Sequence, residues 1–206
     1  TVGVCRVPDA PNRCRASCLG CCTRRNRAIA PRTTLRLLAT LASKPFDDPA
    51  WLFEIKWDGY RVQAVVADRK VRIWTRNLHD AETYFPRLLT PPTWIEAREA
   101  IVDGEVVALD DAGRPDFGLL QERLGDKAAP GLVFQAFDLL YLDGRSLLDV
   151  PLEDRKRLLK SVLRTHPRVR FAAHVDGEGL AFFEAALRSL APDGVVAFIC
   201  ADDTHG

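Results

Sequence analysis

Apolar and charged residues alternate along residues 53–66, which is the pattern of half-buried β-strands. Residues 53–57 alternate on one side of the pair Asp58-Gly59, and Tyr60, Val62, Ala64 and Val66 alternate on the other side. A two-residue Asp-Gly connection between alternating runs is the usual signal of a β-hairpin. The pattern therefore predicts a hairpin, and a third alternating run at residues 71–76 predicts that it continues into an antiparallel meander.

The rest of the pattern predicts a mixed α/β domain with mainly antiparallel strands. Continuous or alternating apolar runs predict strands at residues 100–109, 132–142, 169–175 and 195–199. Helical spacing predicts a short helix after a turn within residues 77–89, and helices at residues 116–124, 151–163 and 179–190. Two of these helices begin at residues suited to a first turn, Asp116 as a cap and Pro151.

Charge and cysteine usage set the first part of the chain apart. Residues 1–36 hold eight arginines and one acidic residue, whereas the remainder holds 21 basic and 27 acidic residues. Five of the six cysteines also lie in this part, without the paired spacing of a structural zinc site or the even number of a disulfide framework. We expect residues 1–32 to be a poorly ordered basic tail or linker, which is favoured over a nucleic-acid arm, and residues 33–206 to be the domain.

The 206 residues contain no methionine and start at Thr1, which predicts a piece of a longer protein. No apolar run has the length of a signal-peptide core or a membrane span. The expected location is therefore the cytoplasm, with no membrane partner and with reduced thiols.

Candidate chemistry begins with Lys56. In the predicted hairpin, Lys56 lies opposite Arg61, and two facing cations suggest an anion between them. A lysine amine becomes a nucleophile when a neighbouring cation or burial lowers its pKa, and a phosphate is an electrophile that Arg61 could hold. The alternative is an edge hairpin with two solvated charges.

Three further residues are candidates that also have ordinary structural interpretations. Arg76 ends a predicted strand and is either a site cation or a surface charge. Glu105 follows Asp103-Gly104 in an apolar strand, so its carboxylate needs a sugar hydroxyl, a divalent cation or an internal arginine. Phe137 could stack on a base or belong to the core.

The order of these segments resembles the motif series of ATP-dependent DNA ligases, most closely that of the ligase module of bacterial DNA ligase D, an end-joining enzyme. The motifs that carry the resemblance are residues 53–61, 75–77, 103–105, 137–141 and 193–196. The resemblance extends over residues 36–198. It implies an α+β covalent nucleotidyltransferase fold, the ATP-grasp-like fold of ligase adenylation domains, with antiparallel sheets, flanking helices and an ATP cleft.

The resemblance also implies a reaction and its residues. Lys56 would attack the α-phosphate of ATP and become a lysyl-AMP intermediate for strand joining, with Mg²⁺ or Mn²⁺ as the metal. The implied contacts are Glu54 and Phe137 with the adenine, Arg61 and Arg76 with the ribose and phosphates, Glu105 with the ribose or metal, and Asp193 with the metal. The implied partners are nicked or broken double-stranded DNA at the bacterial nucleoid, other domains of a longer ligase D polypeptide and an end-binding protein.

The chain departs from the family pattern at three positions. Asp193 stands where a glutamate is usual, Phe198 where a basic residue is usual, and Leu78 where a glycine is frequent. The last family motif and the OB-fold domain are absent from these residues, so we expect this fragment not to seal nicks efficiently. Two alternatives remain at this point: another covalent nucleotidyltransferase, such as an RNA ligase or capping enzyme, and a catalytically dead module that binds nucleic acid or a protein partner.

Overall fold

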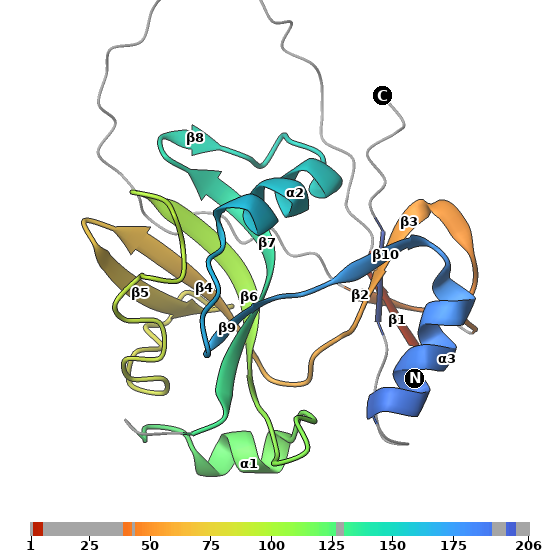
Figure 1. Ribbon diagram of the computed structural model, residues 1–206, viewed down its shortest axis with the longest axis horizontal. Helices are drawn as coiled ribbons and strands as arrows, with labels where there is room; N and C mark the ends of the chain where they lie inside the picture. Colours follow the sequence, from red (N-terminus) through yellow and green to blue (C-terminus); the bar gives the residue numbers. More distant parts are fainter. Residues whose placement is uncertain (1, 6–38, 43, 127–129, 191–196, 201–206) are drawn as a thin grey trace, which may run out of the picture.

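The computed structural model describes residues 2–5, 39–42, 44–126, 130–190 and 197–200, and these residues form two β-sheets with helices packed on them (Figure 1). The first sheet has five strands in the order β10-β3-β11-β1-β2, in which only the β1–β11 pair is parallel. Its strands are β1 (Val2–Cys5), β2 (Ala39–Ala42), β3 (Asp48–Glu54), β10 (His174–Gly177) and β11 (Ala197–Cys200).

The second sheet has six strands, ordered β5-β4-β6-β7-β8, with β9 paired to β7 in parallel. Its strands are β4 (Tyr60–Ala67), β5 (Lys70–Thr75), β6 (Ala100–Ala108), β7 (Leu132–Leu142), β8 (Arg145–Ser146) and β9 (Val169–Phe171). The two central strands, β6 and β7, are buried along most of their length. One face carries the main core, which includes Trp94 and Phe134, and the strands also hold the buried polar residues Asp103, Gln135 and Asp138.

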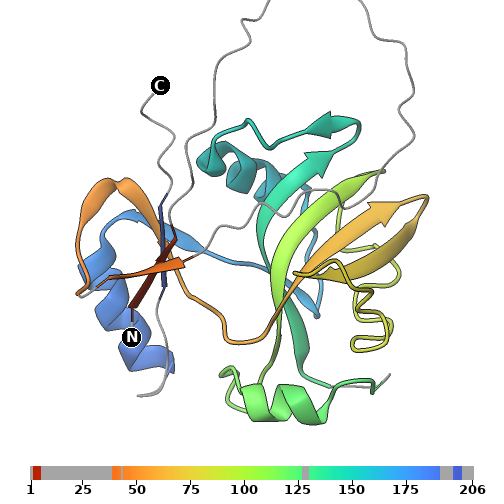
Figure 2. The same ribbon diagram turned by 180° about the vertical axis from the view of Figure 1, so that it is seen from behind.

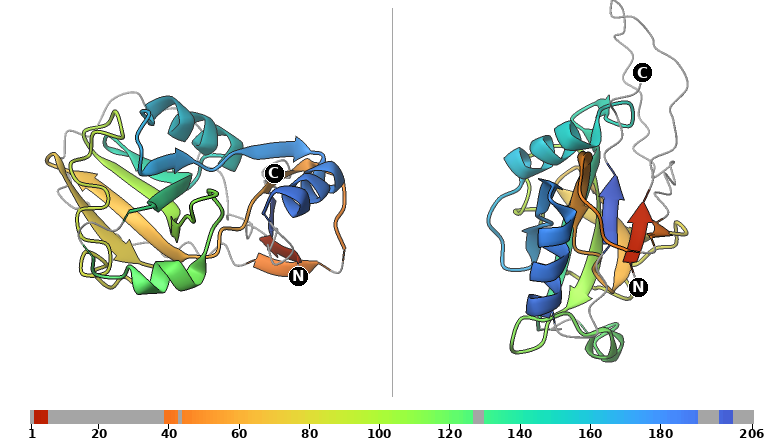
Figure 3. Two further views of the ribbon diagram at one scale, coloured as in Figure 1. Left: turned by 60° about the horizontal axis from the view of Figure 1, so that its bottom comes forward. Right: turned by 90° about the vertical axis from the view of Figure 1, so that its right-hand side faces the viewer.

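In the described part of the chain, three helices cover the sheets. They are α1 (Phe117–Glu122), α2 (Leu152–Val162) and α3 (Gly179–Leu190). Helix α2 packs on β7, and α3 packs on β3 and β10 through a cluster around Phe53. Two connections join the sheets: the segment from β3 to β4 and the segment from β9 to β10, both of which can be followed from behind in Figure 2 and from below in Figure 3.

The strands and helices predicted at residues 100–109, 116–124, 132–142, 151–163 and 179–190 are present with small differences at their ends. The Asp116 side chain caps α1 by accepting a hydrogen bond from the backbone N–H of Leu119 at 2.9 Å, as expected for an N-cap. Among the described residues, no helix is long and apolar enough to cross a membrane.

Three local predictions were wrong. Residues 53–66 form no hairpin, because β3 pairs with β10 and β11 whereas β4 pairs with β5 and β6 of the other sheet. Residues 77–89 form turns rather than a short helix. Residues 169–175 contribute to two strands, one in each sheet, rather than to one strand.

The predicted division at residue 32 stays a prediction. The strand β1, which belongs to the basic tail, lies between β2 and β11 in the first sheet. Residues 6–38, with four of the tail cysteines, lie outside the described residues.

Candidate functional site

Lys56 lies on a five-residue connection, residues 55–59, that joins the two sheets. Its side chain is exposed, whereas Trp57 beside it packs against Val107 and Val133 of the second sheet. A Cβ on Gly59 would lie 2.1 Å from the carbonyl oxygen of Val106, so the close approach of the connection to β6 requires a glycine at this position. The anchored indole and the close backbone contact fix the connection that presents Lys56.

Arg61 does not lie opposite Lys56 as predicted, because the register of β4 on β6 places it opposite Glu105. The Arg61 guanidinium donates to both carboxylate oxygens of Asp103, at 2.9 Å from Nη2 and 3.3 Å from Nε. Its carbon Cζ also lies 5.3 Å from the centroid of the Phe137 ring. The structure therefore brings Arg61, Glu105 and Phe137 together on the face of the second sheet.

Glu105 has a strongly perturbed acidity. Burial raises its pKa from the usual 4.5 to about 7, although the positive charges of Arg61 and Lys56 lower it and the carboxylates of Asp103 and Asp58 raise it again. The influence of Lys56 and Asp58 on this group places the 55–59 connection within electrostatic range of Glu105. A carboxylate that is costly to ionise on a sheet face is typical of a functional group rather than of a structural one.

This acidity predicts a pH-dependent stability difference for Glu105→Gln. Below pH 4.5 the glutamate is neutral in both the folded and the unfolded state. Because its pKa is raised in the folded state, the free energy of unfolding falls as the pH rises from 4.5 to about 7. The glutamine cannot ionise. The free energy of unfolding of the variant, relative to that of the wild type, should therefore increase by about 2 kcal/mol from pH 5 to pH 8. Urea unfolding at the two pH values measures the gain, with the exposed Glu122→Gln as a control, and an equal difference at both values would contradict the prediction.

A β-bulge sets the position of Phe137. Across β6 and β7, Asp103 pairs with Asp138 and Gly104 with Ala136, so that Phe137 is the extra residue. A bulge redirects a side chain and leaves its backbone out of the regular ladder. The freed Phe137 carbonyl accepts a hydrogen bond from Lys156 Nζ at 2.9 Å.

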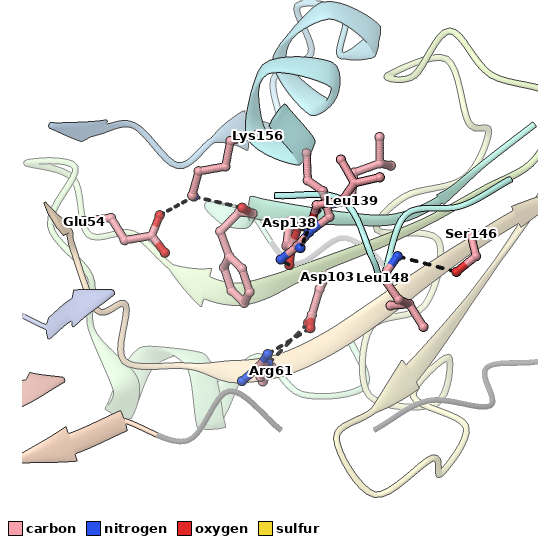
Figure 4. A network of polar contacts seen from close by, with 11 residues as sticks. Glu54, Arg61, Asp103, Asp138, Leu139, Ser146, Leu148 and Lys156 are labelled. Atoms are coloured by element: carbon pink, nitrogen blue, oxygen red, sulfur yellow. Dashed lines mark hydrogen bonds and ion pairs between the residues drawn. The ribbon is translucent and has the colours of Figure 1, made fainter. Parts of the chain in front are cut away.

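Glu54, the last residue of β3, is 2% exposed and pairs with Lys156, which is 1% exposed. Lys156 Nζ lies 2.6 Å from Glu54 Oε2. This contact joins the end of the first sheet to α2 and to the bulge of the second (Figure 4). Lys156 is thus a residue of the site region that the sequence analysis did not identify.

A second buried ion pair lies beside the first. Arg155 donates from Nε and Nη2 to the two oxygens of Asp138, at 2.9 and 3.0 Å, and Asp138 also accepts from the backbone N–H of Leu139. Both partners are buried, with 7% of Arg155 and 3% of Asp138 exposed. The pair fastens α2 to the strand that carries Phe137.

The sequence also singled out Arg76, Leu78 and Asp193. Arg76 is exposed directly after β5, and among the described residues no ion pair or hydrogen bond joins its guanidinium to the other candidates. Leu78 has φ of 60°, the left-handed conformation that glycine adopts freely and that costs a larger residue about 1–2 kcal/mol, so the turn keeps a glycine-like shape without its glycine. Asp193 lies outside the described residues.

The described residues contain no cluster of three or more histidine, cysteine or acidic side chains that could hold a metal. A groove of about 260 Å³ lies behind the Lys56 connection, lined by Trp57, Gln135, Phe171, His174 and Phe182 among others. Its buried Trp57 Nε1 and His174 Nδ1 atoms have no hydrogen-bond partner among the described residues.

Comparison with protein families gives a match to the family "ATP dependent DNA ligase domain" over residues 37–196. The chain is 33% identical over 145 residues to the SPbeta prophage-derived DNA ligase-like protein LigB of Bacillus subtilis, which covers 69% of this chain and 52% of that protein. It is 37% identical over 138 residues to the multifunctional non-homologous end joining protein LigD of Pseudomonas aeruginosa, which covers 66% of this chain and 16% of that protein. The chain thus spans about half or less of the length of these relatives.

Two solved structures agree with these matches. The ligase domain of LigD from M. tuberculosis superposes with a TM-score of 0.57 at 32% identity, over 70% of this chain and 47% of that one. A mycobacterial DNA ligase D complexed with ATP and MES superposes with a TM-score of 0.59 at 27% identity, over 75% of this chain and 56% of that one. These similarities confirm the predicted α+β fold of ligase adenylation domains.

Proposed function

Because this chain belongs to the family of ATP-dependent DNA ligase domains, we propose that it forms a covalent lysyl-AMP intermediate on Lys56, as the adenylation part of an enzyme that joins DNA strands in end-joining repair. The observation that carries the proposal is the position of Lys56. It is an exposed amine on an anchored connection, next to a sheet face that carries Arg61, Glu105 and Phe137.

The nucleotide contacts follow from the chemistry of these groups. The Phe137 ring offers a face for the adenine, and the guanidinium stacked on it supplies positive charge for phosphate oxygens. Glu54 is an acceptor for the edge of the base, and Glu105 for ribose hydroxyls. For Arg76 the proposed contact with a phosphate rests on the family resemblance alone.

The proposed reaction needs one nucleophile. The Lys56 amine, once it has lost a proton, attacks the α-phosphorus of ATP. A nitrogen–phosphorus bond forms, the bond from the α-phosphorus to the bridging oxygen breaks, and pyrophosphate leaves with the bonding electrons. The AMP group then passes to a DNA 5′-phosphate, which a 3′-hydroxyl attacks with release of AMP.

The proposed metal is Mg²⁺, or Mn²⁺ in its place, held by Glu105 and Asp193. Carboxylate oxygens suit these ions, which usually take one or two protein carboxylates together with substrate phosphates. Glu105 is a candidate ligand because it is an acidic side chain within range of the charges of Arg61, Lys56, Asp103 and Asp58. When bound, the ion would neutralise charge on the triphosphate and orient the leaving group.

The proposed partners are nicked or broken double-stranded DNA, further domains of a longer polypeptide and an end-binding protein. The relative from Pseudomonas aeruginosa is named a multifunctional end-joining protein, which supports this group of partners. Phe198, which replaces a basic residue of the family, lies in β11 opposite Phe53. We propose that residues 1–206 carry out the first step and seal nicks poorly, in the cytoplasm of a bacterium.

The test is incubation with Mg²⁺ and ATP labelled on its α-phosphate, followed by denaturing electrophoresis. The proposal predicts a labelled protein band that is lost in acid and is stable in alkali, because a phosphoramidate hydrolyses in acid whereas esters of serine or tyrosine do not behave in this way. It also predicts release of the label by added pyrophosphate. A folded protein that takes no label from ATP would contradict the proposal.

The similarities do not favour either alternative drawn from the sequence. The relatives compared above are named a DNA ligase-like protein, an end joining protein LigD and a DNA ligase D, and none of them is named an RNA ligase or a capping enzyme. Label from GTP without label from ATP would favour a capping enzyme, and no label from either would favour a catalytically dead module.

A further inference from the structure

Lys156 joins the two groups that would hold a nucleotide base. From α2 its side chain reaches Glu54 Oε2 at 2.6 Å (Figure 4). The same ammonium group donates to the Phe137 carbonyl at 2.9 Å. Glu54 precedes Lys56 by two residues, and Phe137 is the bulge residue whose ring lies under Arg61. One buried ammonium group therefore fixes the acceptor for the base edge and the ring for the base face.

The surroundings of Glu54 make Lys156 the main group that favours its charged form. Burial raises the pKa of Glu54, and Lys156 opposes this effect by its charge and its hydrogen bond. The other charged groups are Asp138 of β7, which raises this pKa, and Arg61 of β4, which lowers it. Opposite Glu54 on β10 lies His174, whose own pKa is lowered mainly by burial, so it is neutral at pH 7 and adds no positive charge.

We propose that Lys156 is a positioning residue that gives this site its preference for adenine over guanine nucleotides. The proposal rests on the proposed function, in which Glu54 meets the edge of the base. Lys156 donates to Oε2, and in this proposal the other oxygen, Oε1, is the acceptor that meets the base. Adenine presents an amino group, a donor, where guanine presents an oxygen, an acceptor, so an ionised Glu54 attracts adenine and repels guanine.

Removal of the ammonium group should weaken this discrimination. In Lys156→Met the charge and the hydrogen bond by which Lys156 lowers the pKa of Glu54 disappear, so burial raises this pKa further and favours the protonated carboxyl. A protonated carboxyl can donate to the guanine oxygen. We therefore expect the ratio of ATP to GTP affinity to fall by about tenfold or more, the size of a charge-assisted hydrogen bond, and to recover as the pH is raised.

The experiment is calorimetric binding of the α,β-methylene analogues of ATP and GTP, which resist cleavage, to the wild type and variants between pH 6 and pH 9. The matched control is Lys160→Met, one helical turn further on, where the ammonium lies 5.9 Å from the Phe171 ring and is exposed. This control should keep the wild-type ratio. Glu54→Gln mimics the protonated carboxyl, so it should lose the ratio at every pH, and it serves if Lys156→Met does not fold by circular dichroism.

The outcomes separate the two proposals. A lower ratio in Lys156→Met with recovery at high pH supports the role of Lys156. Equal loss of both affinities, or an unchanged ratio, would show that Lys156 only supports the fold. If the wild type binds the ATP analogue selectively but takes no covalent label from ATP, the proposed reaction is wrong, and the affinity ratio of the variants still decides the role of Lys156. If a folded wild type binds neither analogue, both the proposed function and the role of Lys156 are wrong.

Discussion

Replacement of Lys56 by methionine is expected to abolish covalent labelling by ATP without unfolding the protein. The side chain is exposed, so its loss leaves no buried charge or cavity and should change the free energy of unfolding by less than about 0.5 kcal/mol. The labelling rate should fall by at least about 10³-fold, because an adduct cannot form without its nucleophile. Denaturing electrophoresis after incubation with labelled ATP measures the rate, and thermal unfolding measures stability.

A matched control for this variant is Lys70→Met, at the exposed start of β5. Its labelling should equal that of the wild type within a factor of about two, since a surface charge remote from the site contributes little. Label that persists in Lys56→Met, or that falls equally in both variants, would show that the nucleophile lies elsewhere.

Replacement of Arg155 by methionine is expected to destabilise the protein by about 3–5 kcal/mol, because it leaves the Asp138 carboxylate buried and unpaired. Methionine fills part of the volume but cannot donate the two hydrogen bonds to Asp138 or the one to the Val150 carbonyl. Equilibrium unfolding in urea at pH 7 measures the loss.

The comparison for this prediction is Arg157→Met on the same helix. Arg157 pairs with Glu153 and Asp154, but all three side chains are substantially exposed, so the loss should be below about 1 kcal/mol. Losses of similar size in the two variants would mean that the buried pair does not hold α2 on the second sheet.

The elements predicted correctly from the sequence are those in which the pattern of apolar residues reflects which faces of the element are buried. Residues 132–142 form one continuous apolar strand because both faces of β7 are covered, and residues 179–190 form an amphipathic helix because one side packs on β3 and β10. The family resemblance added what periodicity could not supply, namely that the Lys56 segment lies near Glu105 and Phe137.

The predicted hairpin failed because its signal was local and the pairing was not. Asp58-Gly59 satisfies the turn rule, yet each flanking strand finds partners in a different sheet. Those partners are distant in the chain, since Phe53 pairs with Phe198 and Arg61 with Glu105. The glycine is required by the contact of its backbone with Val106 rather than by a tight turn. A single sequence does not distinguish these two requirements.

The buried lysine was missed because it stands in a run of three cations, residues 155–157, and lysines and arginines are mostly exposed. In α2 the buried residues are Leu152, Arg155, Lys156 and Leu159, which is the spacing of one helix face, whereas Arg157 and Lys160 are exposed. The two cations at core positions therefore carried a signal for buried partners. The identity of those partners, Glu54 and Asp138, could not follow from spacing, since it depends on how the two sheets meet.

The position of the covalent adduct tests most directly whether Lys56 is the nucleophile. The wild-type protein is incubated with ATP and Mg²⁺, digested near neutral pH to preserve an acid-labile bond, and its peptides are sequenced by mass spectrometry. AMP is expected on Lys56 and on no other residue, and added pyrophosphate should remove it when it is supplied before digestion. AMP on a different side chain, with the Lys56 peptide unmodified, would contradict this expectation.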